Sequence, residues 1–197
     1  MQQRGGSTIK GVVTITLMVC NVIFWCTLLF AVALLKAIIP VGAWRRWTSR
    51  GMTVLAEAWI GTNNAIFRLM GSMPLDTRGL EGLSLREWYL VLSNHRSWVD
   101  ILVLQAVFNR RIPFLKFFLK QQLIWVPFLG LAWWALDFPF MRRYTAAYLE
   151  KHPEHRGKDL EVTRRACEKF RLIPTSVMNF VEGTRFTPAK HAALKSP

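Results

Sequence analysis

The longest apolar segment of the chain lies near its N-terminus. Between Gly11 and Leu35 there are 25 consecutive residues without a charged side chain, and the large apolar residues leave no polar face. A helix of this length measures about 37 Å, whereas the hydrocarbon core of a bilayer is roughly 30 Å thick. A signal peptide has a shorter apolar core followed by a small-residue cleavage site, and no such site follows cleanly here. We therefore expect a retained membrane helix over about residues 11–35.

A second apolar-rich stretch runs from Met52 to Met70, but one glutamate and two asparagines interrupt it. It predicts either a helix that folds back on the first one, as a hairpin in one leaflet, or an amphipathic helix on the membrane surface. The pattern is compatible with both. In either case we assign residues 1–72 to an N-terminal membrane anchor and residues 73–197 to a separate domain.

In residues 73–197, apolar runs of strand length alternate with stretches of helical period. Trp88–Leu92 is suited to a buried strand, and Ser176–Val181 is a second candidate for a central strand. Weaker strand candidates are Thr77–Leu83, Ile112–Leu115 and Phe138–Met141, the last disfavoured by its proline. Helices are expected over Ser97–Phe108, Lys116–Trp125 and Lys158–Leu172. The alternation of strands and helices predicts an α/β domain.

The charge balance narrows the choice of partners. The chain carries 26 Lys and Arg against 12 Asp and Glu, for a net charge of +14. Such an excess favours nucleic acid, an anionic membrane surface or an anionic substrate. The basic residues are spread along the chain and no recognised nucleic-acid motif appears, so we expect no nucleic-acid partner. Two basic residues precede the apolar helix and four follow it, which predicts that its C-terminal side faces the cytoplasm.

The cysteines do not indicate a metal site or a disulfide framework. There are three of them, at positions 20, 26 and 167, and no pair has the spacing of metal ligands. We expect no bound metal and a reducing compartment for the main domain.

Two polar clusters follow the two best strand candidates, and ligand sites of α/β folds gather at the carboxyl ends of strands. In the first cluster, His95 lies in a turn and Asp100 follows five residues later. Ser97 and Asp100 also fit a capping box, which would explain Asp100 without any function. Both interpretations can hold, because a capped Asp100 can orient the imidazole. A neutral His95 would then accept a proton from a substrate hydroxyl, with Asp100 setting its tautomer.

The second cluster is the segment from Glu182 to Arg185. Gly183 permits a tight turn, and the planar guanidinium of Arg185 suits a phosphate group. The alternative is an ordinary turn with a surface ion pair between Glu182 and Arg185. Between the two clusters, the basic pair Arg142–Arg143 offers either a second phosphate contact or a solvated charge pair.

Together these segments resemble the glycerolipid acyltransferase family, the PlsC-type 1-acylglycerol-3-phosphate acyltransferases. The family's first motif, His-x4-Asp, is matched by His95 and Asp100 within NHRSWVD. Its third motif, Glu-Gly-Thr-Arg, is matched by residues 182–185 within FVEGTRF. The motifs are in the family's order and spacing, and the resemblance runs from about Gly79 to His191.

The family's second motif spans Lys120 to Arg143, with Pro127 and Gly130 in place. The stretch LKQQLIWVPFLGLAWWALDFPFMRR and the later VEGTRFTPAKH are most similar to the bacterial YihG-like branch and its eukaryotic lysophospholipid acyltransferase relatives.

The resemblance implies an acyltransferase-type mixed sheet with flanking helices and a role in phospholipid biosynthesis. A fatty acyl group would pass directly from acyl-CoA, or from acyl carrier protein, to the hydroxyl of a lysophosphatidate or related lysophospholipid, without a cofactor. His95 would be the general base and Asp100 its partner. The substrate-binding residues would be Glu182, Gly183, Thr184 and Arg185, joined by Arg143 and Lys120. The location implied is the bacterial inner membrane, in contact with phospholipid, with the acyltransferase domain in the cytoplasm.

One departure from the family concerns the C-terminus. Members continue beyond the third motif with a further strand and a fourth motif, whereas this chain ends at Pro197, twelve residues after Arg185. We therefore expect a C-terminally truncated domain. The alternative function is a catalytically inactive, truncated membrane protein that binds anionic lipid, and consumption of acyl-CoA in the presence of lysolipid distinguishes the two.

Overall fold

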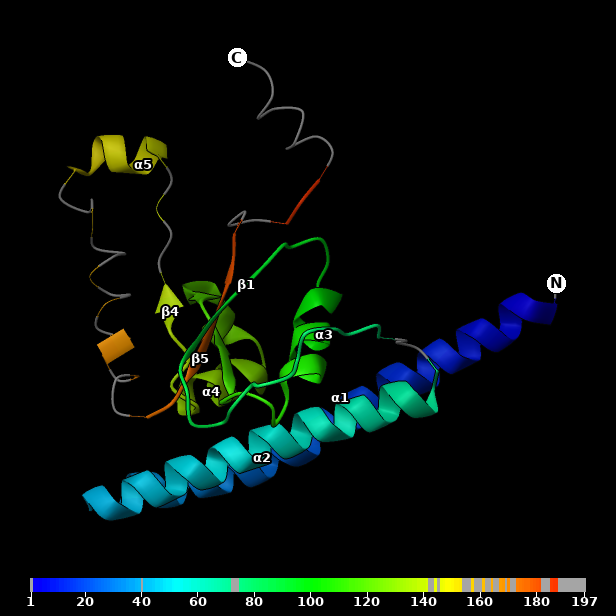
Figure 1. Ribbon diagram of the computed structural model, residues 1–197, viewed down its shortest axis with the longest axis horizontal. Helices are drawn as coiled ribbons and strands as arrows, with labels where there is room; N and C mark the ends of the chain where they lie inside the picture. Colours follow the sequence, from blue (N-terminus) through cyan, green and yellow to red (C-terminus); the bar gives the residue numbers. More distant parts are fainter. Residues whose placement is uncertain are drawn as a thin grey trace. The chain divides into compact units, whose positions relative to one another are not determined.

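A computed structural model describes most of the chain. The described residues are 2–39, 41–71, 75–141, 144, 146–153, 157, 161, 164, 167, 168, 170, 173–181 and 185–187. They form two compact units (Figure 1). The first unit comprises Met1–Gly79 and Gln121–Phe138, and the second comprises Leu80–Lys120 and Pro139–Pro197.

The first unit is built on two long antiparallel helices, α1 (Gln2–Ile38) and α2 (Gly42–Leu69), which lie side by side (Figure 1). Within α1, Thr8–Ile38 is long and apolar enough to cross a membrane, and an 18-residue window of it has a mean hydropathy of 2.4. The second helix, expected over Met52–Met70, begins ten residues earlier, at Gly42, and it folds back along α1.

The contact between the two helices follows from the sequence of α2. Its buried residues lie at intervals of three or four, which places them on one face; they are Thr48, Met52, Ala56, Ile60 and Asn63. At the middle of the pair, Asn21 of α1 donates a hydrogen bond from Nδ2 to Oδ1 of buried Asn63, at 2.7 Å. A polar contact surrounded by apolar side chains fixes the register of two helices, because any slip leaves both amides unsatisfied.

A 3₁₀ helix, η1 (Gln121–Trp125), and a short helix, α4 (Leu129–Ala135), complete the first unit. Ala132 of α4 is buried in a cluster with Cys26 and Leu29 of α1 and Met52 of α2. A side chain at Gly130 would collide with the carbonyl group of Ile124, so glycine allows α4 to pack directly on the backbone of η1.

The second unit contains a parallel sheet in the order β1 (Tyr89–Ser93), β5 (Ser176–Phe180), β2 (Leu115–Phe117). A second, two-stranded parallel sheet pairs β3 (Leu119–Lys120) with β4 (Phe140–Met141). Helix α3 (Val99–Phe108) follows β1, and α5 (Ala146–Lys151) follows β4. The expected α/β fold, with its sheet, flanking helices and N-terminal apolar helix, is therefore confirmed.

Two of the strand expectations are confirmed with small shifts, and one is not. β5 occupies the centre of its sheet, as expected for Ser176–Val181, and β1 matches Trp88–Leu92 to within one residue. β1 lies at the edge of the sheet and is not buried, since Leu90 and Leu92, which share one face, are 69% and 56% exposed. The segment Thr77–Leu83 is not a strand.

The clearest error concerns Lys116–Trp125, which was expected to be one helix. This stretch instead completes β2, forms β3 and ends in the 3₁₀ helix η1. Leu115–Phe117 pairs with β5 and Leu119–Lys120 pairs with β4, so partners far away in the sequence override the local helical pattern. The expected strand Ile112–Leu115 overlaps the observed β2 only at its last residue.

The remaining two expectations concern the later part of the chain. The strand candidate Phe138–Met141 contains β4, which begins directly after Pro139. The expected helix Lys158–Leu172 lies largely outside the described residues, and its described positions 161, 164, 167 and 168 are helical.

Candidate active site

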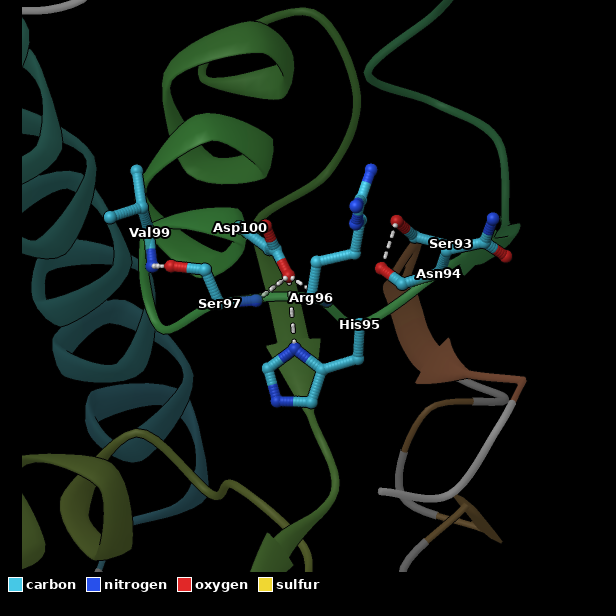
Figure 2. A network of polar contacts seen from close by, with 7 residues as sticks. All are labelled: Ser93, Asn94, His95, Arg96, Ser97, Val99 and Asp100. Atoms are coloured by element: carbon cyan, nitrogen blue, oxygen red, sulfur yellow. Dashed lines mark hydrogen bonds and ion pairs between the residues drawn. The ribbon is translucent and has the colours of Figure 1, made fainter. Parts of the chain in front are cut away.

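The turn between β1 and α3 gathers polar contacts on a single carboxylate oxygen (Figure 2). Nδ1 of His95 lies 3.1 Å from Oδ2 of Asp100. The same oxygen accepts the backbone N–H groups of Arg96, at 2.6 Å, and Ser97, at 2.7 Å. The imidazole lies on one side of this carboxylate, whereas the side chain of Arg96 extends the opposite way (Figure 2).

The local sequence explains why Asp100 is held at this point. Oγ of Ser97 accepts the N–H of Val99 at 3.0 Å, and Asp100 accepts the N–H of Ser97 in return. The second is the return bond of a capping box, whereas the Ser97 hydroxyl caps the N–H of the second residue after it and not the third. Trp98, directly before α3, already has helical angles (φ −62°, ψ −25°) and makes no side-chain cap of its own. The capping interpretation therefore holds together with the contact to His95, because one oxygen serves both.

The electrostatics of the turn favour an ionised Asp100. Burial alone raises the pKa of its carboxyl group, but the hydrogen bonds from Ser97, His95 and Arg96 and the attraction to His95 outweigh it and lower the pKa below its usual value. An ionised carboxylate can only accept hydrogen bonds, so a neutral His95 carries its proton on Nδ1. The lone pair that accepts a further proton is then on Nε2.

The third motif meets the first through the pairing of β1 and β5. Ser93, the last residue of β1, is in register with Phe180, the last residue of β5. The phenyl ring of Phe180 stacks on the imidazole of His95, with ring centroids 3.8 Å apart. Beyond β5, the N–H of Val181 donates to the carbonyl of Ser93, and the N–H of Phe186 donates to the carbonyl of His95 at 2.7 Å. Backbone hydrogen bonds therefore flank residues 182–184 on both sides.

Arg185 belongs to the same neighbourhood. Its guanidinium carbon lies 5.2 Å from the centre of the Trp98 ring, within the range of a cation–π contact. The structure thus brings Arg185 near His95 and Asp100, although Arg185 follows His95 by 90 residues in the sequence.

The other site residues expected from the sequence are placed differently. Lys120 is exposed and belongs to the β3–β4 sheet, in register with Met141. Arg143 and Glu182, Gly183 and Thr184 lie outside the described residues.

Sequence reasoning missed two aromatic residues of this site, Phe180 and Trp98. Both stand inside segments that it had singled out, within FVEGTRF and NHRSWVD. The signal available was position alone: Phe180 is the last residue but one of the strand candidate Ser176–Val181, and Trp98 is the second residue of the expected helix Ser97–Phe108.

Comparisons with known proteins bear on the family and the fold. The family model described as Acyltransferase matches residues 58–196. The crystal structure of the 1-acyl-sn-glycerophosphate (LPA) acyltransferase, PlsC, from Thermotoga maritima has a similar fold, with a TM-score of 0.53 and 16% sequence identity. The similarity covers 91% of this chain and 64% of that one, so the chain spans less than two thirds of the length of that protein. No curated protein sequence matches the chain.

Proposed function

Because this chain belongs to the acyltransferase family, we propose that it transfers a fatty acyl group from a thioester to the hydroxyl of lysophosphatidate or a related lysophospholipid. The donor is acyl-CoA or acyl carrier protein. The observation that carries the proposal is the contact of His95 with Asp100, 3.1 Å long, in the turn after β1 and beside Arg185. Within the family we assign the chain to the bacterial YihG-like branch, on the similarity of the segment from Leu119 to Arg143.

In the proposed reaction His95 acts as a general base. Nε2 accepts the proton of the lysolipid hydroxyl while the oxygen attacks the thioester carbonyl. The new C–O bond forms, the C–S bond breaks, and the proton passes from the imidazolium to the leaving thiolate. Asp100 keeps Nδ1 protonated and stabilises the imidazolium, which is the role that its lowered pKa suits. The attacking oxygen belongs to the substrate, so no nucleophile of the protein is needed.

We assign the phosphate of the acceptor to the basic residues near the third motif. Arg185 presents a planar guanidinium beside Trp98, and such a group can bind phosphate through two parallel hydrogen bonds. We propose that Gly183 and Thr184, together with Glu182, complete the acceptor-binding part of the site. Arg143 and Lys120 are the proposed second basic contact: Lys120 pairs with Met141, two residues before Arg143.

We further propose that α1 anchors the enzyme in the bacterial inner membrane, with the acyltransferase domain in the cytoplasm. The length and hydropathy of Thr8–Ile38 support the anchor, and the excess of basic residues after the helix supports the orientation. The proposed acceptor is itself a membrane lipid. A membrane anchor would keep the enzyme at the surface where this acceptor is concentrated.

The test is release of the free CoA thiol by the purified full chain, supplied with acyl-CoA and a panel of lysolipids in mixed micelles. We expect thiol release that requires both a lysolipid and His95, and an acylated product of matching mass. Binding of anionic lipid without acyl-CoA consumption on any lysolipid would support the lipid-binding alternative and reject the enzyme. The same assay with acyl carrier protein thioester identifies the donor.

A further inference from the structure

Helix α4 exposes a stripe of large apolar side chains. Phe128, directly before the helix, and Leu131 and Trp134 within it are 50%, 52% and 60% exposed. Leu131 and Trp134 are three residues apart, which places them about 60° apart on one side of the helix. Trp125, at the end of η1, adds a fourth side chain that is 85% exposed. We refer to these four residues as the α4 stripe.

The opposite side of α4 is fixed to the apolar helix of the first unit. Ala132 is buried against Cys26 and Leu29, which lie within the segment of α1 that is long and apolar enough to cross a membrane. Two residues after the end of α4, Asp137 lies 3.9 Å from Lys36 of α1. One residue within α4 and one just beyond it are therefore in contact with two points along α1. Whatever depth this part of α1 has in a bilayer, α4 has a similar depth.

The composition of the segment around α4 is compatible with a position inside the bilayer. From Gln121 to Leu136 there are 16 residues without a charged side chain, and the first charged residue after them is Asp137. Exposed Trp, Phe and Leu side chains gathered within ten residues are unfavourable in water and suit a surface that something apolar covers. Tryptophan in particular is enriched where hydrocarbon meets the polar headgroups, because its ring is apolar and its N–H is polar.

We propose that the α4 stripe is a second membrane contact of this protein, which inserts into the bilayer beside α1. The occupant is phospholipid, not a second protein, because the Ala132 cluster fixes α4 to the segment of α1 that is long and apolar enough to cross a membrane. This inference rests on the proposed membrane anchoring. It adds that the segment carrying Pro127 and Gly130 of the second motif is itself a lipid-contacting element.

Site-specific photocrosslinking tests the inference on the full chain reconstituted into vesicles of phosphatidylethanolamine and phosphatidylglycerol. Leu131→p-benzoylphenylalanine reports on the stripe, and the same replacement at Trp134 provides a second position if the first variant folds poorly. Leu85 is the matched control, because it is 53% exposed and belongs to the second unit. Ile15, 66% exposed on α1, reports on the anchor itself. Lipid adducts on each position are measured by mass spectrometry.

We expect lipid adducts at Leu131 and Ile15, several-fold more abundant than at Leu85. Adducts at Ile15 without any at Leu131 and Trp134 would overturn the inference and leave the anchor intact. Equal labelling at Leu131 and Leu85, or crosslinks from Leu131 to a second copy of the chain, would also overturn it. No lipid adduct at any position would reject the anchor and the inference together. Thiol release by each variant is measured separately, so a failure of the proposed enzymatic activity is recognised independently.

Discussion

The imidazole of His95 stacks on the phenyl ring of Phe180, with ring centroids 3.8 Å apart and 17° between the planes. Asp100 holds one edge of the same imidazole through Nδ1. One contact comes from the turn after β1 and the other from the end of β5, and the parallel pairing of these strands brings them together. The direction of Nε2 is therefore set by two segments that are far apart in the sequence.

Replacing Phe180 should impair turnover more than binding. Phe180→Ala removes one face of the support for the imidazole, and we expect kcat to fall a few-fold to roughly tenfold, as the ~0.5–1.5 kcal/mol of an aromatic pair implies. KM for donor and acceptor should stay close to the wild-type values. Phe180→Tyr keeps the ring and should restore kcat. If kcat of a folded Phe180→Ala variant equals that of the wild type, the ring does not position His95.

The proposed base gives the largest expected effect. His95→Ala should lower kcat by about 10²- to 10⁴-fold, the range that a positioned general base contributes. Asp100→Asn should lose less, because the base remains but is poorly oriented. His152→Ala is the matched control, since His152 is an exposed histidine whose ring is tilted by 31° against that of Tyr148 of α5. Near wild-type turnover by folded His95→Ala, measured by thiol release, would eliminate general-base catalysis by this residue.

The contact of His95 with Asp100 could be predicted from the sequence, whereas the packing of Phe180 on His95 could not. The contact of His95 with Asp100 follows from local chemistry, because Ser97 caps the helix and brings Asp100 back over the turn. The stacking of Phe180 depends on which strand pairs with β1, and apolar runs carry no information about their neighbours. The same limit explains the error at Lys116–Trp125, where pairing with two distant strands decided the conformation.

Stability should depend on pH through Asp100. Its pKa is lowered in the folded protein, so its ionised form stabilises the fold above the unfolded-state pKa of about 3.9 and this contribution is lost as the pH falls through the folded-state value. Asp100→Asn should therefore unfold at lower denaturant concentration than the wild type at pH 7. The difference between the two proteins should shrink below about pH 4. A difference that is constant from pH 7 to pH 2 would contradict this account.

Arg185 should affect the acceptor and not the donor. Arg185→Lys keeps the charge but loses the planar guanidinium, which can bind phosphate through two parallel hydrogen bonds. KM for the lysophospholipid should therefore rise, while KM for acyl-CoA should change little. Arg164→Lys is the matched control, because Arg164 is 77% exposed and its partner is Glu168, at 3.9 Å. Initial rates over a range of each substrate give both constants. An unchanged acceptor KM in the Arg185 variant would show that the phosphate binds elsewhere.

Gly130 should be intolerant of a single added methyl group. Gly130→Ala places a Cβ against the carbonyl group of Ile124, and backbone cannot move aside as a flexible side chain can. We expect the variant to lose about 1–3 kcal/mol of unfolding free energy, the usual cost of overpacking. Gly51→Ala is the matched control, because a Cβ at this position of α2 meets nothing within 4 Å. There alanine should stabilise slightly through its better helix propensity. Thermal unfolding in detergent compares the two, and equal melting temperatures would show that α4 does not rest on η1 as closely as the clash requires.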